Sequence, residues 1–226
     1  MDKKKREIFS RLFKLRFAIL YPLGIWALIS GYATNASLAR GLWLIVLGLA
    51  VRSWANCYAI KMAKLTTSGP YAHVRHPLYL GSFLILSGFL VTVNMNWLGV
   101  LFSIIVVIGI VYKQTVQNEE RMLTEKFGQE YTDYKNAVPA FFPVVFPFRG
   151  GQKWPASLSR YFKSQEYKLV IWMSVLVIFF MLKEKLILEK QGLNSEVKTL
   201  IGIASVLVIT DLIAEIFRQK AKRSGK

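Results

Sequence analysis

The chain has 226 residues, of which 54% are hydrophobic and 19% charged, and its formal net charge is +17. The apolar residues form long blocks rather than alternating, a composition typical of an integral membrane protein. The basic residues flank these blocks without zinc-ligand spacing or a recognition-helix pattern, so membrane topology explains the charge better than a nucleic-acid partner does. The single cysteine, Cys57, excludes an internal disulfide and a CxxC motif.

The N-terminal segment MDKKKREIFSRLFKLR is densely charged, and no small-residue cleavage site follows the next apolar run, so we expect the first helix to be retained. Blocks close to the ~20 residues that cross a hydrocarbon core then predict six membrane spans. The fifth has only ~14 uninterrupted apolar residues before Lys183. The approximate bounds are Phe17 to Ala33, Leu42 to Met62, Leu78 to Val93, Trp97 to Val116, Leu169 to Leu188 and Val197 to Phe217.

Lysine and arginine counts orient these spans, because cytoplasmic loops carry the excess of positive charge. Twenty-four of the thirty basic residues fall on the side that holds both termini, five fall on the opposite side, and Arg52 lies inside a span. We therefore predict a multi-pass membrane protein with a cytoplasmic N-terminus and a cytoplasmic C-terminus.

The predicted fold is an all-α integral membrane protein. Residues 1–150 would form a four-helix transmembrane core with a cytoplasmic cofactor-binding segment. Residues 151–226 would form a connector and a C-terminal two-helix transmembrane appendage, with RGGQKWPASLSR, from Arg149 to Arg160, as the connecting sequence.

The first polar cluster is GPYAHVRHPLYLG, which precedes the third predicted span. Gly69-Pro70 is a turn signal, and Pro77 disfavours helical dihedrals at His76, so Arg75 and His76 should lie on irregular backbone. Irregular backbone at membrane depth survives where it is buried in protein or lines a polar cavity. A pocket at the cytoplasmic interface and a loop that anchors Arg75 and Tyr71 at lipid headgroups both fit these residues.

The second cluster is NEERMLTEKFGQEYTDYKNAVPAFFP, after the fourth span. Glu119 and Glu120 stand near the C-terminal end of that span, where carboxylates are unfavourable unless a cation faces them. Arg75, Arg52 or a cationic ligand could be that partner. We expect Glu120 to begin a helix that ends at Gly128, with Tyr131 and Tyr134 on one face of the next turn. An amphipathic helix packed on the membrane is the alternative.

Arg52 lies ten or more residues from either end of the second span, and a charge this deep requires a partner, for which we propose Glu119 or Glu120. A structural ion pair and a ligand contact both remain open for it. Asp211 and Glu215 in the last span have Arg218 on the same helical face, which favours pairing among themselves.

The two clusters together resemble the isoprenylcysteine carboxyl methyltransferase family and the related phospholipid N-methyltransferases. The resemblance covers about Gly48 to Pro143. It consists of LGLAVRSWA, the RHPxY motif from Arg75 to Tyr79, the Glu119-Glu120 pair, and FGxEYxxYKxxVP from Phe127 to Pro139.

This resemblance implies that S-adenosylmethionine binds in a cytoplasm-facing cavity and that a lipidic acceptor enters from the bilayer. It implies catalytic roles for Arg75, His76 and Glu120, and cofactor contacts for these three with Glu119. Aromatic contacts would come from Tyr79, Tyr131 and Tyr134, and acceptor contacts from Arg52 and Trp54. No metal is expected.

The family resemblance leaves the acceptor open. A prenylcysteine-type carboxylate needs no general base, whereas a phospholipid amine would require one, and a hydrophobic thiol is a further option. Two other classes compete with the enzyme: a non-catalytic membrane scaffold that keeps the fold, and a transporter that uses Arg52, Asp211 and Glu215 as intramembrane charges.

Overall fold

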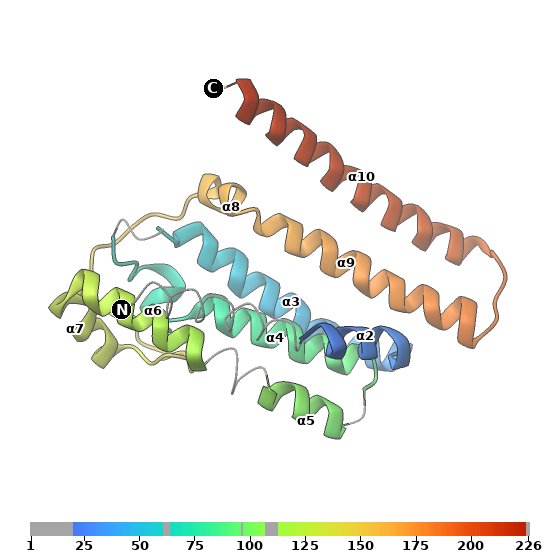
Figure 1. Ribbon diagram of the computed structural model, residues 1–226, viewed down its shortest axis with the longest axis horizontal. Coiled ribbons are helices and arrows are strands. Elements are labelled where there is room, and N and C mark those ends of the chain that lie inside the picture. Colours follow the sequence, from blue (N-terminus) through green and yellow to red (C-terminus); the bar gives the residue numbers. More distant parts are fainter. Residues whose placement is uncertain (1–19, 61–63, 96, 107–112, 225–226) are drawn as a thin grey trace, which may run out of the picture.

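The computed structural model describes residues 20–60, 64–95, 97–106 and 113–224, in which the regular elements are helices joined by turns and irregular segments (Figure 1). The helices run, in chain order, α2 (Leu20–Ser30), α3 (Asn35–Tyr58), η1 (Gly69–Ala72), α4 (Pro77–Thr92), α5 (Trp97–Val106), α6 (Lys113–Phe127), α7 (Gln129–Ala137), α8 (Leu158–Ser164), α9 (Glu166–Lys183), the π-helical turn η3 (Glu184–Leu188) and α10 (Ser195–Ser224). The all-α prediction is therefore confirmed for this part of the chain. The expected start of the first span, the end of the second and the middle of the fourth lie outside the described residues.

Helix α3 begins seven residues before the predicted Leu42 because Thr34 caps it. The Thr34 hydroxyl accepts from the Ser37 backbone N–H, and the Ser37 hydroxyl accepts from the Thr34 N–H, forming a reciprocal capping box. Ser37 also donates to the Thr92 carbonyl at 2.8 Å, which joins the start of α3 to the end of α4.

Four glycines set the close antiparallel packing of α3 on α4. A Cβ at Gly41 would lie 2.4 Å from the Gly88 carbonyl oxygen, and one at Gly48 would lie 2.6 Å from the Gly81 carbonyl oxygen. The two glycine pairs are two helical turns apart, so one small-residue seam runs between the helices. Small residues let helix backbones approach closely, which is the main source of packing energy between helices in lipid.

Helix α9 lies beside α3, and α10 turns back along α9 and diverges from it toward the C-terminus (Figure 1). The charge of Lys183 is satisfied at the end of α2: its Nζ donates to the carbonyl oxygens of Leu28, Ile29 and Gly31 at 2.6 to 2.9 Å. These are carbonyls of the last turn of α2 and the residue after it, which carry partial negative charge. Lys183, which interrupts the fifth predicted span, thus caps the C-terminal end of α2, which lies in the first predicted span.

Two helices among the described residues, Asn35–Tyr58 and Ser195–Lys220, are long and apolar enough to cross a bilayer by length and composition. Large apolar side chains on their surfaces face outward, including Trp43 on α3 and Val206 and Phe217 on α10. Soluble monomers rarely expose such contiguous apolar faces.

The short helices α6 and α7 gather at the end of the bundle where α3 ends and α4 begins (Figure 1). A small core of Leu65, Tyr131, Tyr134 and Val138 fixes α7 there, with Leu123, Phe127 and Phe148 packed around it. This arrangement brings the two polar clusters of the sequence together.

Candidate cofactor site

The RHPxY segment is irregular where Pro77 predicts it to be. His76 has φ −123° and ψ 62° and precedes the first turn of α4, with Pro77 at the helix start. The Arg75 backbone N–H donates to the Pro139 carbonyl at 2.9 Å, which ties the segment to the residues after α7. Gly69, at φ 61°, begins the 3-10 turn that leads into it.

The Glu120 carboxylate joins three basic side chains. Its oxygens lie 2.9 Å from Arg75 Nη2, 3.2 Å from His76 Nε2 and 2.8 Å from Lys135 Nζ. The hydrogen bond from His76 is the largest influence, and with Lys135 and Arg75 it lowers the pKa of Glu120 to about 2, although burial opposes the shift. Arg75 therefore confirms the expectation that a cation faces the glutamates.

Glu119 occupies a different environment from its neighbour. Its side chain is 47% exposed, against 12% for Glu120, and its Oε2 lies 3.9 Å from His76 Nδ1. His76 is thus flanked by a carboxylate at each ring nitrogen. Both glutamates lie inside α6, because this helix begins at Lys113 rather than at Glu120 as the sequence predicted. The predicted end at Gly128 is confirmed, and Gly128 takes the positive φ of 57° that suits glycine.

Helix α7 supplies two buried tyrosines on one face, as predicted. The Tyr134 hydroxyl donates to the Tyr71 carbonyl at 2.6 Å, whereas the buried Tyr131 hydroxyl has no hydrogen-bond partner in the described structure. Burial raises the pKa of both phenols, so they stay protonated at physiological pH.

These groups surround a cavity of about 320 Å³ between α3, α6, α7 and the start of α4. Two of its lining residues carry buried polar atoms without partners, Arg75 Nε and the Tyr131 hydroxyl. Unpaired buried donors are costly, so they mark where a polar ligand would gain hydrogen bonds. The lining comprises Asn56, Ala59, Ile60, Lys64, Leu65, Thr66, Tyr71, Arg75, His76, Leu78, Glu119, Leu123, Tyr131 and Tyr134.

Five of the residues singled out in the sequence meet in this cavity: Arg75, His76, Glu119, Tyr131 and Tyr134. Glu120 does not line the cavity, but its carboxylate contacts two residues that do, Arg75 and His76. Tyr79 is also outside the lining, and its ring centroid lies 5.7 Å from that of His76.

The proposed partner of Arg52 was wrong. Arg52 is paired with Glu166, the first residue of α9, and also donates to the Leu78 carbonyl at 3.1 Å and to the Ser82 hydroxyl. Glu120 is already held by Arg75 and Lys135. Trp54 lies elsewhere, in a second cavity described below.

Sequence reasoning missed Lys135 and Glu166, and it considered Tyr71 only as a headgroup anchor, whereas Tyr71 lines the cavity. Lys135 stands inside the FGxEYxxYKxxVP motif, and its position one residue after Tyr134 was the available signal. Glu166 stands three residues before the apolar block that begins at Leu169, a position that suits a carboxylate in the first turn of a helix. Nothing in the sequence around Tyr71 indicated that its carbonyl would accept from Tyr134.

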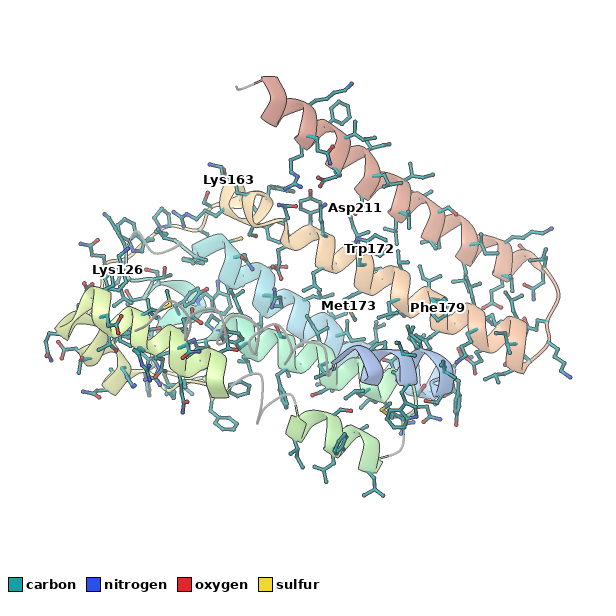
Figure 2. The ribbon with its side chains drawn as sticks, in the orientation of Figure 1. Lys126, Lys163, Trp172, Met173, Phe179 and Asp211 are labelled. Atoms are coloured by element: carbon teal, nitrogen blue, oxygen red, sulfur yellow. The ribbon has the colours of Figure 1, made fainter. Side chains whose placement is uncertain are left out.

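The remaining charges predicted to lie in the last span are also paired. Glu215 accepts from Arg218, as expected, and from Lys168 of α9 at 2.7 Å, and Trp172 donates to Asp211 at 3.2 Å. Figure 2 shows Trp172 and Asp211 facing each other between α9 and α10. Within the described ranges, no three His, Cys, Asp or Glu side chains gather as a metal site would require.

Residues 21–130 match the phospholipid methyltransferase family. The chain is 28% identical over 151 residues to the nickel-cobalt-cadmium resistance protein NccN of Alcaligenes xylosoxydans xylosoxydans, covering 59% of this chain and 70% of NccN. It is 30% identical over 126 residues to the cobalt-zinc-cadmium resistance protein CzcN of Cupriavidus metallidurans, covering 55% and 57%. No solved structure matches at a significant level.

The chain is also 33% identical over 97 residues to the protein-S-isoprenylcysteine O-methyltransferase of Schizosaccharomyces pombe, which covers 42% of this chain and 40% of that enzyme. It thus spans less than two thirds of CzcN and of this methyltransferase. The family match and this relative confirm the predicted family and, with it, the enzyme class. Residues 21–130 therefore match the phospholipid methyltransferase family, and the chain is similar to the isoprenylcysteine methyltransferases.

Proposed function

We propose that this protein is an S-adenosylmethionine-dependent methyltransferase that acts at the cytoplasmic face of a membrane on a lipidic acceptor. The observation that carries the proposal is the cavity of about 320 Å³ in which Arg75, His76, Glu119 and Tyr131 converge, with two buried donors left unpaired. Family membership supports methyl transfer as the reaction class. The lipid tail of the acceptor is inferred from the apolar surroundings of the bundle.

The cavity's donors and acceptors suit the polar groups of this cofactor. The two Nη atoms of Arg75 contact the Glu120 carboxylate and the Lys135 carbonyl. The Nε–H has no partner and is therefore the group that would donate to the carboxylate of the cofactor. The half-exposed Glu119 is placed to accept from an ammonium group or ribose hydroxyls. The Tyr131 hydroxyl is a further donor, and the rings of Tyr131 and Tyr134 offer faces for an adenine or a sulfonium.

We assign Glu120 a positioning role rather than a contact with the cofactor. Its carboxylate is saturated by Arg75, His76 and Lys135. It therefore fixes the rotamers of the two motif residues that face the cavity. Tyr79 packs beside the His76 ring and supports it from the following turn of α4.

When bound, S-adenosylmethionine would supply an electrophilic methyl group on its sulfonium sulfur, and the acceptor would displace S-adenosylhomocysteine in line. For such a reaction the protein contributes alignment and exclusion of water. A carboxylate acceptor needs no base. With an amine acceptor, His76 Nδ1 is the proton acceptor that the cavity offers, and Glu119 beside it would stabilise the resulting charge.

We propose that the acceptor reaches the site from the bilayer, past Arg52. This arginine lines a cavity of about 270 Å³ between α4 and α9 whose other walls are mostly apolar, among them Leu86, Phe89 and Met173.

The proposed topology has six spans and cytoplasmic termini. Outward-facing apolar side chains on α3 and α10 and the asymmetric distribution of lysine and arginine support it.

Two measurements test the proposal. The full chain in lipid nanodiscs should bind S-adenosylhomocysteine in a calorimetric titration, and Glu119→Gln should weaken binding while Glu125→Gln, on the exposed side of α6, should not. Native membranes given a radiolabelled methyl donor should then place label in the lipid or prenylated-protein fraction. Binding without labelling would indicate a scaffold that keeps the fold, and absence of binding would contradict the site itself.

A further inference from the structure

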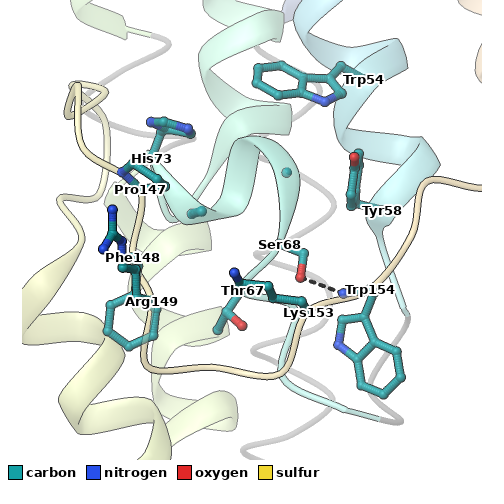
Figure 3. Close-up of a pocket in the computed structure, with 12 residues that line it drawn as sticks. Trp54, Tyr58, Thr67, Ser68, His73, Pro147, Phe148, Arg149, Lys153 and Trp154 are labelled. Carbon is teal, nitrogen blue, oxygen red and sulfur yellow. Dashed lines mark hydrogen bonds between the residues drawn. The ribbon is translucent and has the colours of Figure 1, made fainter.

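A second cavity, of about 530 Å³ (Figure 3), is lined by Thr67, Ser68, Gly69, Ala72 and His73, whereas Thr66 and Tyr71 of the same segment, Thr66 to His73, line the cofactor cavity. The end of α3 supplies Trp54 and Tyr58, Phe148 lies just before the connecting sequence, and the connecting sequence supplies Arg149, Lys153 and Trp154. The two cavities share no lining residue. The connector wall is held in place by the Phe148 N–H, which donates to the Ala72 carbonyl at 2.8 Å, and by the Trp154 N–H, which donates to the Ser68 hydroxyl at 2.8 Å.

The cavity is cationic. Arg149 and Lys153 line it, and no aspartate or glutamate does. Both residues are exposed, and neither side chain forms a hydrogen bond or ion pair with another described residue. Two unpaired cations beside aromatic walls favour an anionic ligand with an apolar part.

An apolar track leads into the cavity along α3. Trp43, Leu47, Ala50 and Trp54 are exposed at helical spacing on one face, and Trp54 is also part of the cavity wall. Eleven residues of helix span about 16 Å, close to the ~15 Å hydrocarbon thickness of one leaflet. The track therefore has the length of one acyl chain in the proposed cytoplasmic leaflet.

The rim of the cavity continues this apolar surface. Phe142, Val145 and Phe146, just before the lining residue Pro147, are 82 to 84% exposed. The Val144 N–H between them donates to the His73 carbonyl at 2.9 Å, so the exposed residues belong to a hydrogen-bonded segment. Aromatic side chains beside arginine and lysine are typical of the membrane interface.

We propose that this cavity binds the headgroup of an anionic membrane phospholipid. Arg149 and Lys153 hold the phosphate, and an acyl chain lies along the exposed face of α3 from Trp54 to Trp43. The lipid is a bound ligand and not the methyl acceptor, because the Thr66 to His73 segment separates it from the cofactor cavity. The site rests on the proposed membrane embedding and is independent of methyl transfer.

The test uses the full chain in nanodiscs with a phosphatidylglycerol that carries a photoreactive group on its acyl chain. Crosslinks mapped by peptide mass spectrometry should fall on α3 between Trp43 and Trp54. Unlabelled phosphatidylglycerol should compete at least tenfold better than phosphatidylcholine, because each cation near an anionic lipid contributes about a fivefold gain in binding. Arg149→Gln with Lys153→Gln should remove that preference.

A matched control is Lys163→Gln with Lys220→Gln, which removes the same charge from two exposed lysines outside the cavity and should leave the crosslinks unchanged. Equal competition by the two lipids would overturn the proposal. Competition by millimolar glycerol phosphate would assign the cavity to a free phosphate compound and would likewise overturn a lipid site. Binding of S-adenosylhomocysteine, measured in the same nanodiscs, reports the proposed enzyme function separately.

Discussion

The carboxylate of Glu120 in α6 lies 2.9 Å from the guanidinium Nη2 of Arg75, which precedes α4. This ion pair joins the two polar clusters that the sequence separates by α4 and α5. It also divides the adjacent glutamates by role, because Glu120 holds the motif in place while Glu119 faces the cavity.

The two glutamates should respond differently to neutralisation. Glu120→Gln should lower both stability, by about 2 kcal/mol, and cofactor affinity, since it leaves partly buried Arg75 without its counter-charge. Glu119→Gln should lower affinity with little change in stability. Thermal unfolding and calorimetric titration in nanodiscs measure the two effects. If the two variants lost stability and affinity to the same extent, Glu119 and Glu120 would not have the different roles proposed for them.

Removing the unpaired hydroxyl of Tyr131 should raise the stability of the empty protein and lower its affinity for the cofactor. Tyr131→Phe should stabilise the empty protein by about 1 kcal/mol, because it removes a buried polar group without a partner, and should weaken cofactor binding about fivefold. The control is Tyr134→Phe, which loses a hydrogen bond to the Tyr71 carbonyl and should destabilise. If Tyr131→Phe left affinity unchanged, the hydroxyl would not contact the cofactor.

The lowered pKa of Glu120 predicts that its contribution to the stability of the fold is lost at low pH. Its folded value is about 2, below the ~4.3 of an unfolded glutamate, so the charged form is stabilised by folding. This contribution is complete above pH ~4.3 and is lost as the pH falls toward 2. The stability difference between the wild type and Glu120→Gln, measured by denaturant unfolding, should therefore shrink between pH 5 and pH 3. A difference that stayed constant over this range would contradict the shift.

The Arg52 and Glu166 pair attaches α9 to the core. Glu166→Ala should destabilise the protein by about 3 kcal/mol, because a largely buried guanidinium loses its counter-charge. Replacing both residues by methionine should recover much of the loss, since the pair is removed as a unit. Unfolding in detergent compares the three proteins, and a double variant as unstable as the single one would argue against pairing as the cause.

The glycine seam predicts that small additions are costly between α3 and α4. A Cβ at Gly48 would lie 2.6 Å from the Gly81 carbonyl oxygen and 2.9 Å from the Ile85 amide nitrogen, so Gly48→Ala should destabilise by about 2 kcal/mol. Gly202→Ala in α10 is the control. Nothing lies within 4 Å of its Cβ, and the better helix propensity of alanine should stabilise slightly. Equal stability of the two variants would show that the helices do not pack through this seam.

Local sequence patterns were sufficient to predict the helical class, the irregular backbone at Arg75 and His76, the end of α6 at Gly128 and the shared face of Tyr131 and Tyr134. Each follows from local chemistry: apolar block length, the steric effect of Pro77, glycine at positive φ and helical periodicity. The resemblance to the methyltransferase family also came from the sequence, because each of its motifs is short and contiguous.

The pairing of the charges could not be predicted in the same way, because it depends on the packing of distant helices. Arg52 pairs with Glu166 across 114 positions, Lys183 caps α2, and Glu120 rather than Glu119 receives Arg75 and Lys135. A sequence pattern does not distinguish two adjacent glutamates. They differ in the structure because successive side chains of a helix project in different directions and so reach different partners. Pairing between distant charges depends on how α3, α4 and α9 pack, and no local propensity encodes that packing.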